Sequence, residues 1–173
     1  ETIDARVQAS LVDARPTLIP LDTPAPMVTP NYMRRIGIIA GHYGTVPEEY
    51  GSTLDPGAVC PDGLTEREIN LDIAQRVVAN LRDRGYNVDL LEEHDATLTG
   101  YVGDLVVSLH SNDCSEYAGG ASGYLVAKAE SRPEDGEDTL LVNCMAQFYG
   151  RATSLPQHFG YTRDMTDYHI FSK

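Results

Sequence analysis

Two short apolar runs, each followed by a histidine, constrain the fold of this chain more than any other feature. Residues 35–40 read R-I-G-I-I-A and lead to His42, while residues 105–110 read L-V-V-S-L-H and end in His110. Runs of consecutive apolar residues at this length are typical of strands covered on both faces. The carboxyl ends of parallel strands meet at one edge of a sheet, where α/β proteins commonly bind ligands. We therefore expect both histidines at that edge.

A helix is predicted over residues 65–84, between the two histidines in sequence. Thr65 and Glu68 have the spacing of a capping box, and Gly85 supplies a C-terminal stop. At about 100° per residue, Glu66 lies at the head of the apolar stripe, whereas Glu68 is about 200° away and engaged as a cap. We therefore expect Glu66 to point inward. The stripe consists of Ile69, Ile73, Ala74, Val77, Val78 and Leu81.

The order of elements predicts an α/β fold in a single domain, with a mostly parallel, twisted sheet flanked by helices on both faces. A further strand is expected at 86–91, because strand, helix and strand in succession form the parallel crossover unit. A fourth strand is expected at 123–128. A second helix is expected at 139–151, with an apolar face formed by Leu140, Leu141, Cys144, Met145 and Phe148.

Proline content and chain length indicate the domain boundaries. Residues 1–33 contain five prolines and little periodicity, which indicates a Pro-rich lead-in or linker. The remaining residues, 34–173, are enough for one core and too few for two. The chain begins at Glu1 rather than at methionine, so we expect a processed or excised piece from which any signal peptide has been removed.

Charge and hydropathy exclude two classes of partner. The formal net charge of −13 disfavours binding to nucleic acid or to an anionic membrane surface. No apolar run approaches the roughly 20 residues that a membrane-spanning helix needs. We expect no nucleic-acid partner and no membrane span.

Three cysteines cannot all pair within one chain. Cys60 and Cys114 lie in two loops that flank the expected edge, whereas Cys144 lies in an apolar helical pattern. We expect a disulfide between Cys60 and Cys114 and a buried thiol at Cys144, which suits a secreted or cell-envelope protein. The alternative is a nucleophilic Cys60 or Cys114 paired with His110, for which no local signature is present.

His42, Glu66 and His110 together have the chemistry of a metal site. Two neutral imidazoles and one carboxylate can supply the three protein ligands of a catalytic Zn²⁺, with water in the fourth position. Taken singly, each residue is more often structural: a histidine at a strand end is usually hydrogen-bonded, and a first-turn glutamate usually complements the helix dipole. Their expected convergence on one edge of one sheet is what predicts zinc.

Other polar residues have a less specific interpretation. Asp55 and Asp62 are expected to be turn residues rather than partners of a metal ligand. Asn70 and Ser111 could orient ligands, although Asn70 is equally well explained as a satisfied polar group of the helix. The remaining histidines and glutamates are expected on the surface, in the core or in solvated loops: His94, His158, His169, Glu48, Glu49, Glu92, Glu93 and residues 134–138.

Five stretches, in this order, are similar to a known family. They read I-A-G-H, D-P-G-A, G-L-T-E-R-E-I-N-L-D-I-A, G-Y-N-V-D-L-L and L-V-V-S-L-H-S-N. With them, roughly residues 35–128 resemble the zinc-dependent N-acetylmuramoyl-L-alanine amidases of bacterial cell-wall turnover, of the Amidase_3 type. The resemblance implies Zn²⁺ bound by His42, Glu66 and His110 and a mostly parallel sheet sandwiched by helices. It also implies hydrolysis of the amide that joins N-acetylmuramic acid to L-alanine in peptidoglycan.

The resemblance further implies a glutamate on a late strand that acts as general acid/base. No glutamate follows Glu137, so we expect that residue and its strand beyond Lys173. Two alternatives stay open: a catalytically silent peptidoglycan-binding domain, and another zinc peptidase or amidohydrolase on the same scaffold. Without its last strand the sheet would have an uncovered edge, so we expect a neighbouring chain, residues 1–33 or an oligomer contact to cover it.

Overall fold

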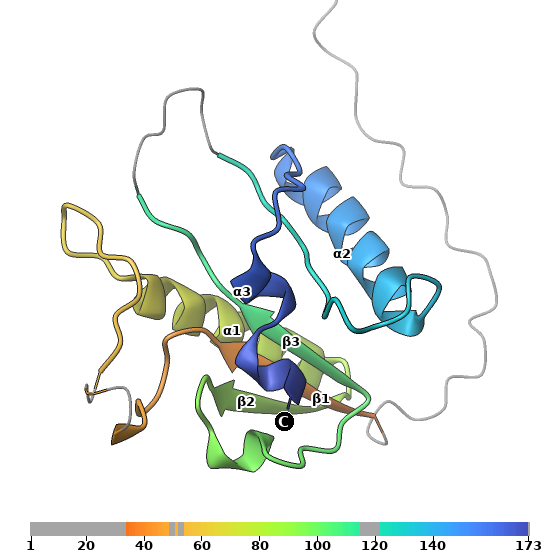
Figure 1. The fold of residues 1–173 in the computed structure, drawn as a ribbon, viewed down its shortest axis with the longest axis horizontal. Coiled ribbons are helices and arrows are strands. Elements are labelled where there is room, and N and C mark those ends of the chain that lie inside the picture. Colours follow the sequence, from red (N-terminus) through yellow and green to blue (C-terminus); the bar gives the residue numbers. More distant parts are fainter. Residues whose placement is uncertain (1–33, 49–50, 52–53, 115–121, 173) are drawn as a thin grey trace, which may run out of the picture.

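A parallel sheet of three strands lies at the centre of the described part of the chain (Figure 1). The computed structural model describes residues 34–48, 51, 54–114 and 122–172, so the predicted Pro-rich lead-in at 1–33 lies outside the described residues. The strands are β1 (Arg35–Ala40), β2 (Asn87–Glu92) and β3 (Leu105–Leu109), in the order β2-β1-β3. The predicted parallel α/β architecture is confirmed.

Helix α1 (Glu66–Asp83) covers one face of this sheet. The predicted capping box is present, since the Thr65 side chain accepts from the Glu68 N–H and the Glu68 side chain accepts from the Thr65 N–H. Most of the predicted stripe packs on β1, although Ile73 is 42% exposed. The buried core between helix and sheet consists of Ile36, Ile38, Ala40, Ala74, Val78 and Val88.

Short helical turns cover the opposite face of the sheet. They are η3 (Ala96–Leu98) and, near the C-terminus, α3 (Arg163–Thr166) and η4 (His169–Ser172), which lie in front of the sheet with α1 behind it in Figure 1. Ile39, Leu91 and Leu98 form a buried cluster on this face, and Ile170 packs against it. The C-terminal segment is therefore brought next to the carboxyl edge of the sheet.

Helix α2 (Glu137–Thr153) lies where the sequence predicts a helix (Figure 1). The face that it buries is not the predicted one. The prediction of a buried Cys144 is wrong: Cys144 is exposed, and so are Leu140 (64%) and Phe148 (65%) on the same stripe. The reason is that α2 packs through Ala146, whose carbonyl accepts from the Tyr124 hydroxyl.

The predicted fourth strand at 123–128 is also wrong. This segment forms an isolated parallel bridge between Tyr124 and Gln157 instead of joining the sheet. The Tyr124 N–H donates to the Pro156 carbonyl and the Tyr124 carbonyl accepts from the His158 N–H, so the backbone groups that a sheet strand would use here are already paired.

Both outer strands of the sheet are edges within the described ranges, because no further described strand pairs with β2 or β3. That a neighbouring chain, residues 1–33 or an oligomer contact covers one of them remains a prediction. None of the helices in the described ranges combines the length and apolar character needed to cross a bilayer.

Candidate metal centre

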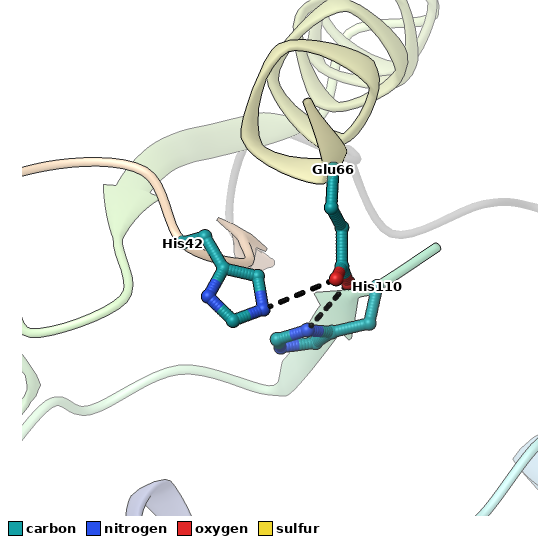
Figure 2. Close-up of side chains that lie close together, drawn as sticks. All are labelled: His42, Glu66 and His110. Atoms are coloured by element: carbon teal, nitrogen blue, oxygen red, sulfur yellow. Dashed lines mark hydrogen bonds and ion pairs between the residues drawn. The ribbon is translucent and has the colours of Figure 1, made fainter. Parts of the chain in front are cut away.

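Three side chains from three different elements converge at the carboxyl edge of the sheet (Figure 2). His42 follows β1, Glu66 begins α1 and His110 follows β3. His42 Nε2 lies 3.4 Å from Glu66 Oε2, and His110 Nδ1 lies 3.3 Å from Glu66 Oε1. One potential ligand atom from each residue lies within 4.8 Å of the others. The sequence-predicted trio is thus brought together.

The orientation of His42 is set by its neighbours. Its ring Nδ1 is 2.8 Å from Asp55 Oδ2, and an ionised carboxylate can only accept, so Nδ1 carries the proton. The lone pair of Nε2 therefore faces Glu66. His42 also has a positive φ of 61°, which is uncommon for a residue with a side chain. Its main-chain N–H donates to Glu93 Oε2, which helps to hold this conformation.

Glu66 is buried, with 8% of its surface exposed, as the helical geometry predicts. The Asn70 amide donates to Oε1 at 3.4 Å, and the Ala58 N–H donates to Oε2 at 3.3 Å. Asn70 is in turn fixed by the Gly41 carbonyl and the Ser111 hydroxyl. Asn70 and Ser111 thus orient the carboxylate of Glu66.

His110 is more open, with 36% of its side chain exposed. Its Nε2 lies 3.1 Å from the Tyr168 hydroxyl, which itself donates to Glu93 Oε1. Burial and the hydrogen bond to Glu93 raise the pKa of Tyr168, so the hydroxyl keeps its proton. Because its proton is directed to Glu93, Tyr168 offers an oxygen lone pair to His110 Nε2.

This donor set fits a divalent transition metal. With Nδ1 of His42 bonded to Asp55 and Nε2 of His110 bonded to Tyr168, the other nitrogen of each ring faces one carboxylate oxygen of Glu66 across 3.3–3.4 Å. Each facing pair of nitrogen and oxygen can share either a proton or a metal cation. Two nitrogens and a carboxylate are the ligands that Zn²⁺ takes in catalytic sites.

The electrostatics of the site also favour a cation. Partial burial disfavours the His42 imidazolium, but the hydrogen bond with Asp55 and the charges of Glu66 and Glu93 outweigh burial and raise the pKa of His42. Burial opposes ionisation of Asp55, yet hydrogen bonds from a main-chain N–H and from His42 lower its pKa. Burial likewise opposes ionisation of Glu93, whose pKa is lowered by Tyr168 and by the His42 N–H.

A disulfide joins two segments beside the site. Cys60 lies in the loop that leads into α1, and Cys114 lies shortly after His110, with their Cα atoms 5.4 Å apart. The predicted pairing is confirmed. Since both sulfurs are engaged, the alternative of a cysteine nucleophile at either position loses its support.

The interpretation of Asp55 was incomplete, and that of Glu93 as solvated charge was wrong. Asp55 is a turn residue, because its Oδ1 accepts from the Gly57 N–H, but it is also the hydrogen-bond partner of His42. Glu93 is 7% exposed and contacts the site, not the solvent. One signal could have identified Glu93: it directly follows β2, as His42 and His110 follow β1 and β3, so the same edge argument applies to it.

The remaining polar residues lie in varied places. Asp62 caps a turn through the Leu64 N–H, as expected. His94 is half-buried, with its ring stacked on His169 at 4.8 Å between centroids, and His169 Nε2 lies 2.9 Å from the Glu93 carbonyl. Tyr168 was not anticipated, since nothing near it in sequence belongs to the site.

One protein family matches the chain. The family described as N-acetylmuramoyl-L-alanine amidase matches residues 36–147, which is more than half of the chain. The matched range contains His42, Glu66 and His110, whereas Tyr168 lies outside it. No curated protein and no solved structure matches the chain.

Proposed function

The chain belongs to the N-acetylmuramoyl-L-alanine amidase family, and from this we propose that it acts as a zinc-dependent hydrolase on the amide between N-acetylmuramic acid and L-alanine of peptidoglycan. The observation that supports this most strongly is the convergence of His42 Nε2, the Glu66 carboxylate and His110 Nδ1. A muramyl peptide is the proposed substrate, which implies action outside the cytoplasmic membrane, in the cell envelope or after secretion.

In this proposal His42, Glu66 and His110 hold the ion. Bound there, Zn²⁺ would supply a Lewis acid for the scissile carbonyl and lower the pKa of a water molecule. Asp55 keeps the His42 ring in the tautomer that offers Nε2. Asn70 and the Ala58 N–H fix both oxygens of Glu66.

Proton transfer to the leaving amine needs a further group. Among the described residues next to the site, the carboxylates of Asp55 and Glu93 each accept hydrogen bonds at both oxygens. Against the effect of burial, these hydrogen bonds lower the pKa of both carboxylates, which makes each a poor proton donor to a leaving amine. We propose that the general acid/base is a glutamate beyond Lys173, as the resemblance implies.

The reaction can be tested on purified sacculi and on a synthetic muramoyl peptide, with the products identified by mass spectrometry. For zinc-loaded protein that includes the proposed glutamate beyond Lys173, we expect stem peptides with a free L-alanine amine. His110→Ala should abolish their release, because one ligand is lost, whereas His158→Ala should not, since His158 bonds the Ser122 carbonyl away from the site. Absence of new amine termini with that protein would contradict the proposal.

The second candidate function is binding without cleavage, as expected for a family member in which no general acid/base reaches the site. A chain without the proton shuttle would bind muramyl peptides without cleaving them, as a silent wall-binding domain. Co-sedimentation with sacculi and no amine release would support this reading. Cleavage of plain peptides that carry no muramic acid would instead indicate another zinc peptidase on the same scaffold.

A further inference from the structure

Glu93 is a buried carboxylate that the proposed reaction does not use. Its side chain lies between the two histidines, 3.8 Å from His42 Nδ1 and 4.0 Å from His110 Nε2. These are the ring atoms that face away from Glu66. Glu93 is therefore on the far side of the histidines from the proposed ion.

Each oxygen of Glu93 accepts a hydrogen bond from a group that belongs to, or contacts, one of the two histidines. Oε2 accepts from the main-chain N–H of His42, and Oε1 accepts from the hydroxyl of Tyr168. The Tyr168 hydroxyl, which donates its hydrogen bond to Glu93, offers an oxygen lone pair to His110 Nε2 at 3.1 Å. A carboxylate only accepts, so Tyr168 donates to Glu93, and the single proton of that hydroxyl is then directed away from His110.

The direction of this series of hydrogen bonds decides which ring nitrogen of His110 is unprotonated and able to bind a metal. A neutral imidazole carries one proton, and if it sits on Nε2 then Nδ1 has the lone pair. The opposite tautomer would donate from Nδ1 to Glu66 Oε1, only 3.3 Å away, and would close the site to a metal. The hydrogen bond through Tyr168 is what opposes that tautomer.

We propose that Glu93 and Tyr168 form a positioning unit, which sets His110 in the Nε2–H tautomer and holds the positive-φ backbone of His42, so that His110 Nδ1 and His42 Nε2 are both presented to the metal. The inference rests on the metal site of the proposed function. It adds two residues to that site, one of which, Tyr168, lies outside the range matched by the family. Neither residue touches the substrate or the ion in this account.

Glu93→Gln distinguishes a positioning role of Glu93 from a merely structural one, because only the positioning role predicts a change in the tautomer of His110. The main-chain N–H of His42 can only donate, so it retains the amide oxygen of Gln, and the amide NH₂ then faces Tyr168. Tyr168 would accept from that NH₂ and turn its own proton toward His110 Nε2. The variant should therefore invert the tautomer of His110 to Nδ1–H while keeping the shape of the side chain.

The tautomer can be read directly in metal-free protein labelled with ¹⁵N-histidine, from two- and three-bond ring correlations recorded at about pH 8.5, where a normal imidazole is neutral. We expect His110 as Nε2–H in the wild type and as Nδ1–H in Glu93→Gln. Tyr168→Phe, which removes the bridge, should give a mixture. Tyr149→Phe, a half-exposed tyrosine of α2, should leave the wild-type spectrum unchanged.

Zinc affinity, measured by competition with a chromophoric chelator, gives the second readout. Glu93→Gln and Tyr168→Phe should each raise the zinc Kd by about 10-fold or more, as loss of hydrogen-bond partners behind a ligand does, and Tyr149→Phe should not. An Nδ1–H tautomer in the wild type, or an unchanged tautomer and Kd in both variants, would overturn the inference. The predicted tautomers with no amide hydrolysis by protein that includes the proposed glutamate would leave the inference standing and refute the proposed function.

Discussion

Two glycines at the site leave no room for any other side chain. A Cβ at Gly41 would lie 2.4 Å from Cε1 of His110, and a Cβ at Gly57 would lie 2.6 Å from Cδ2 of His42 and 2.9 Å from Cβ of Glu66. These contacts are too short for carbon atoms, so a methyl group would displace a ligand. The lack of space for a Cβ at these two positions thus explains the glycines in the G-H and D-P-G-A stretches of the sequence.

Gly57→Ala should therefore weaken zinc binding by about 10-fold or more, because His42 and Glu66 would have to shift. The substitution also costs about 1–2 kcal/mol of folding free energy, since Gly57 has a φ of +64°. Gly63→Ala is the matched control, with a φ of +93° and no neighbour within 4 Å of its Cβ. Chelator competition should show weaker zinc binding for Gly57→Ala alone, and equal affinities in the two variants would contradict the steric account.

Asp55→Asn tests the partner of His42. The amide is neutral and either keeps a weaker acceptor for Nδ1–H or presents its NH₂, which would favour the wrong tautomer. We expect zinc affinity to fall by about 10- to 100-fold. Asp62→Asn, in the same loop, should leave it unchanged, because Asp62 bonds only the Leu64 N–H. A similar loss in both variants would indicate a general effect of loop charge.

At this scale the sequence predicted which three side chains converge, His42, Glu66 and His110, but only part of what surrounds them. Helical geometry separates Glu66 from Glu68 because the angle between neighbouring residues is fixed. Glu93 sits in a charged run that looks like a solvated loop, and its hydrogen-bond partner Tyr168 is 75 residues further along the chain. A contact of that kind depends on how the C-terminal turn folds back, which no local pattern encodes.

At the scale of elements, one polar cluster ties the amino ends of the strands together. Arg35, the first residue of β1, places Nε 2.7 Å from Asp89 Oδ2 on β2, and the Tyr101 hydroxyl donates to the same oxygen at 2.7 Å. Burial would raise the pKa of Asp89, but the bonds from Tyr101 and Arg35 outweigh it and lower the pKa. Burial and Asp89 in turn raise the pKa of Tyr101 to about 12.

This cluster should make stability depend on pH. Since the pKa of Asp89 is lower in the folded state, its stabilising effect is fully present above the unfolded value of about 3.9 and is lost as pH falls through the folded value. Asp89→Asn should therefore lower the free energy of unfolding at neutral pH, and the difference from wild type should shrink below about pH 4. Urea unfolding at a series of pH values measures this. A difference that stays constant into acid would contradict it.

How well each element is predicted depends on whether its packing partners are close to it in sequence. β1, α1 and β2 form one crossover unit, and their apolar patterns and caps predict them within one or two residues. For α2 the pattern gives the helix but not its buried face, because an amphipathic stripe does not say which element will cover it. The 123–128 segment has strand propensity, yet its backbone pairs with Pro156 and His158.

At the scale of the whole molecule, the site depends on the complete sheet. The proposed ligands follow β1, begin α1 and follow β3, and the Cys60–Cys114 disulfide ties the loop before α1 to the segment after β3. The C-terminal turn supplies Tyr168 from a distant part of the sequence. Because no single segment contains two ligands, metal binding requires the folded chain, and zinc should stabilise that fold in return.

The central claim is that His42, Glu66 and His110 hold one divalent ion, and native mass spectrometry of zinc-loaded chain tests it most directly. Glu66 and Glu68 are both first-turn glutamates of α1, but the first faces the histidines and the second caps the helix. We predict one zinc per chain for the wild type and for Glu68→Gln, and loss of the ion in Glu66→Gln. One zinc retained in Glu66→Gln with wild-type affinity would contradict the account.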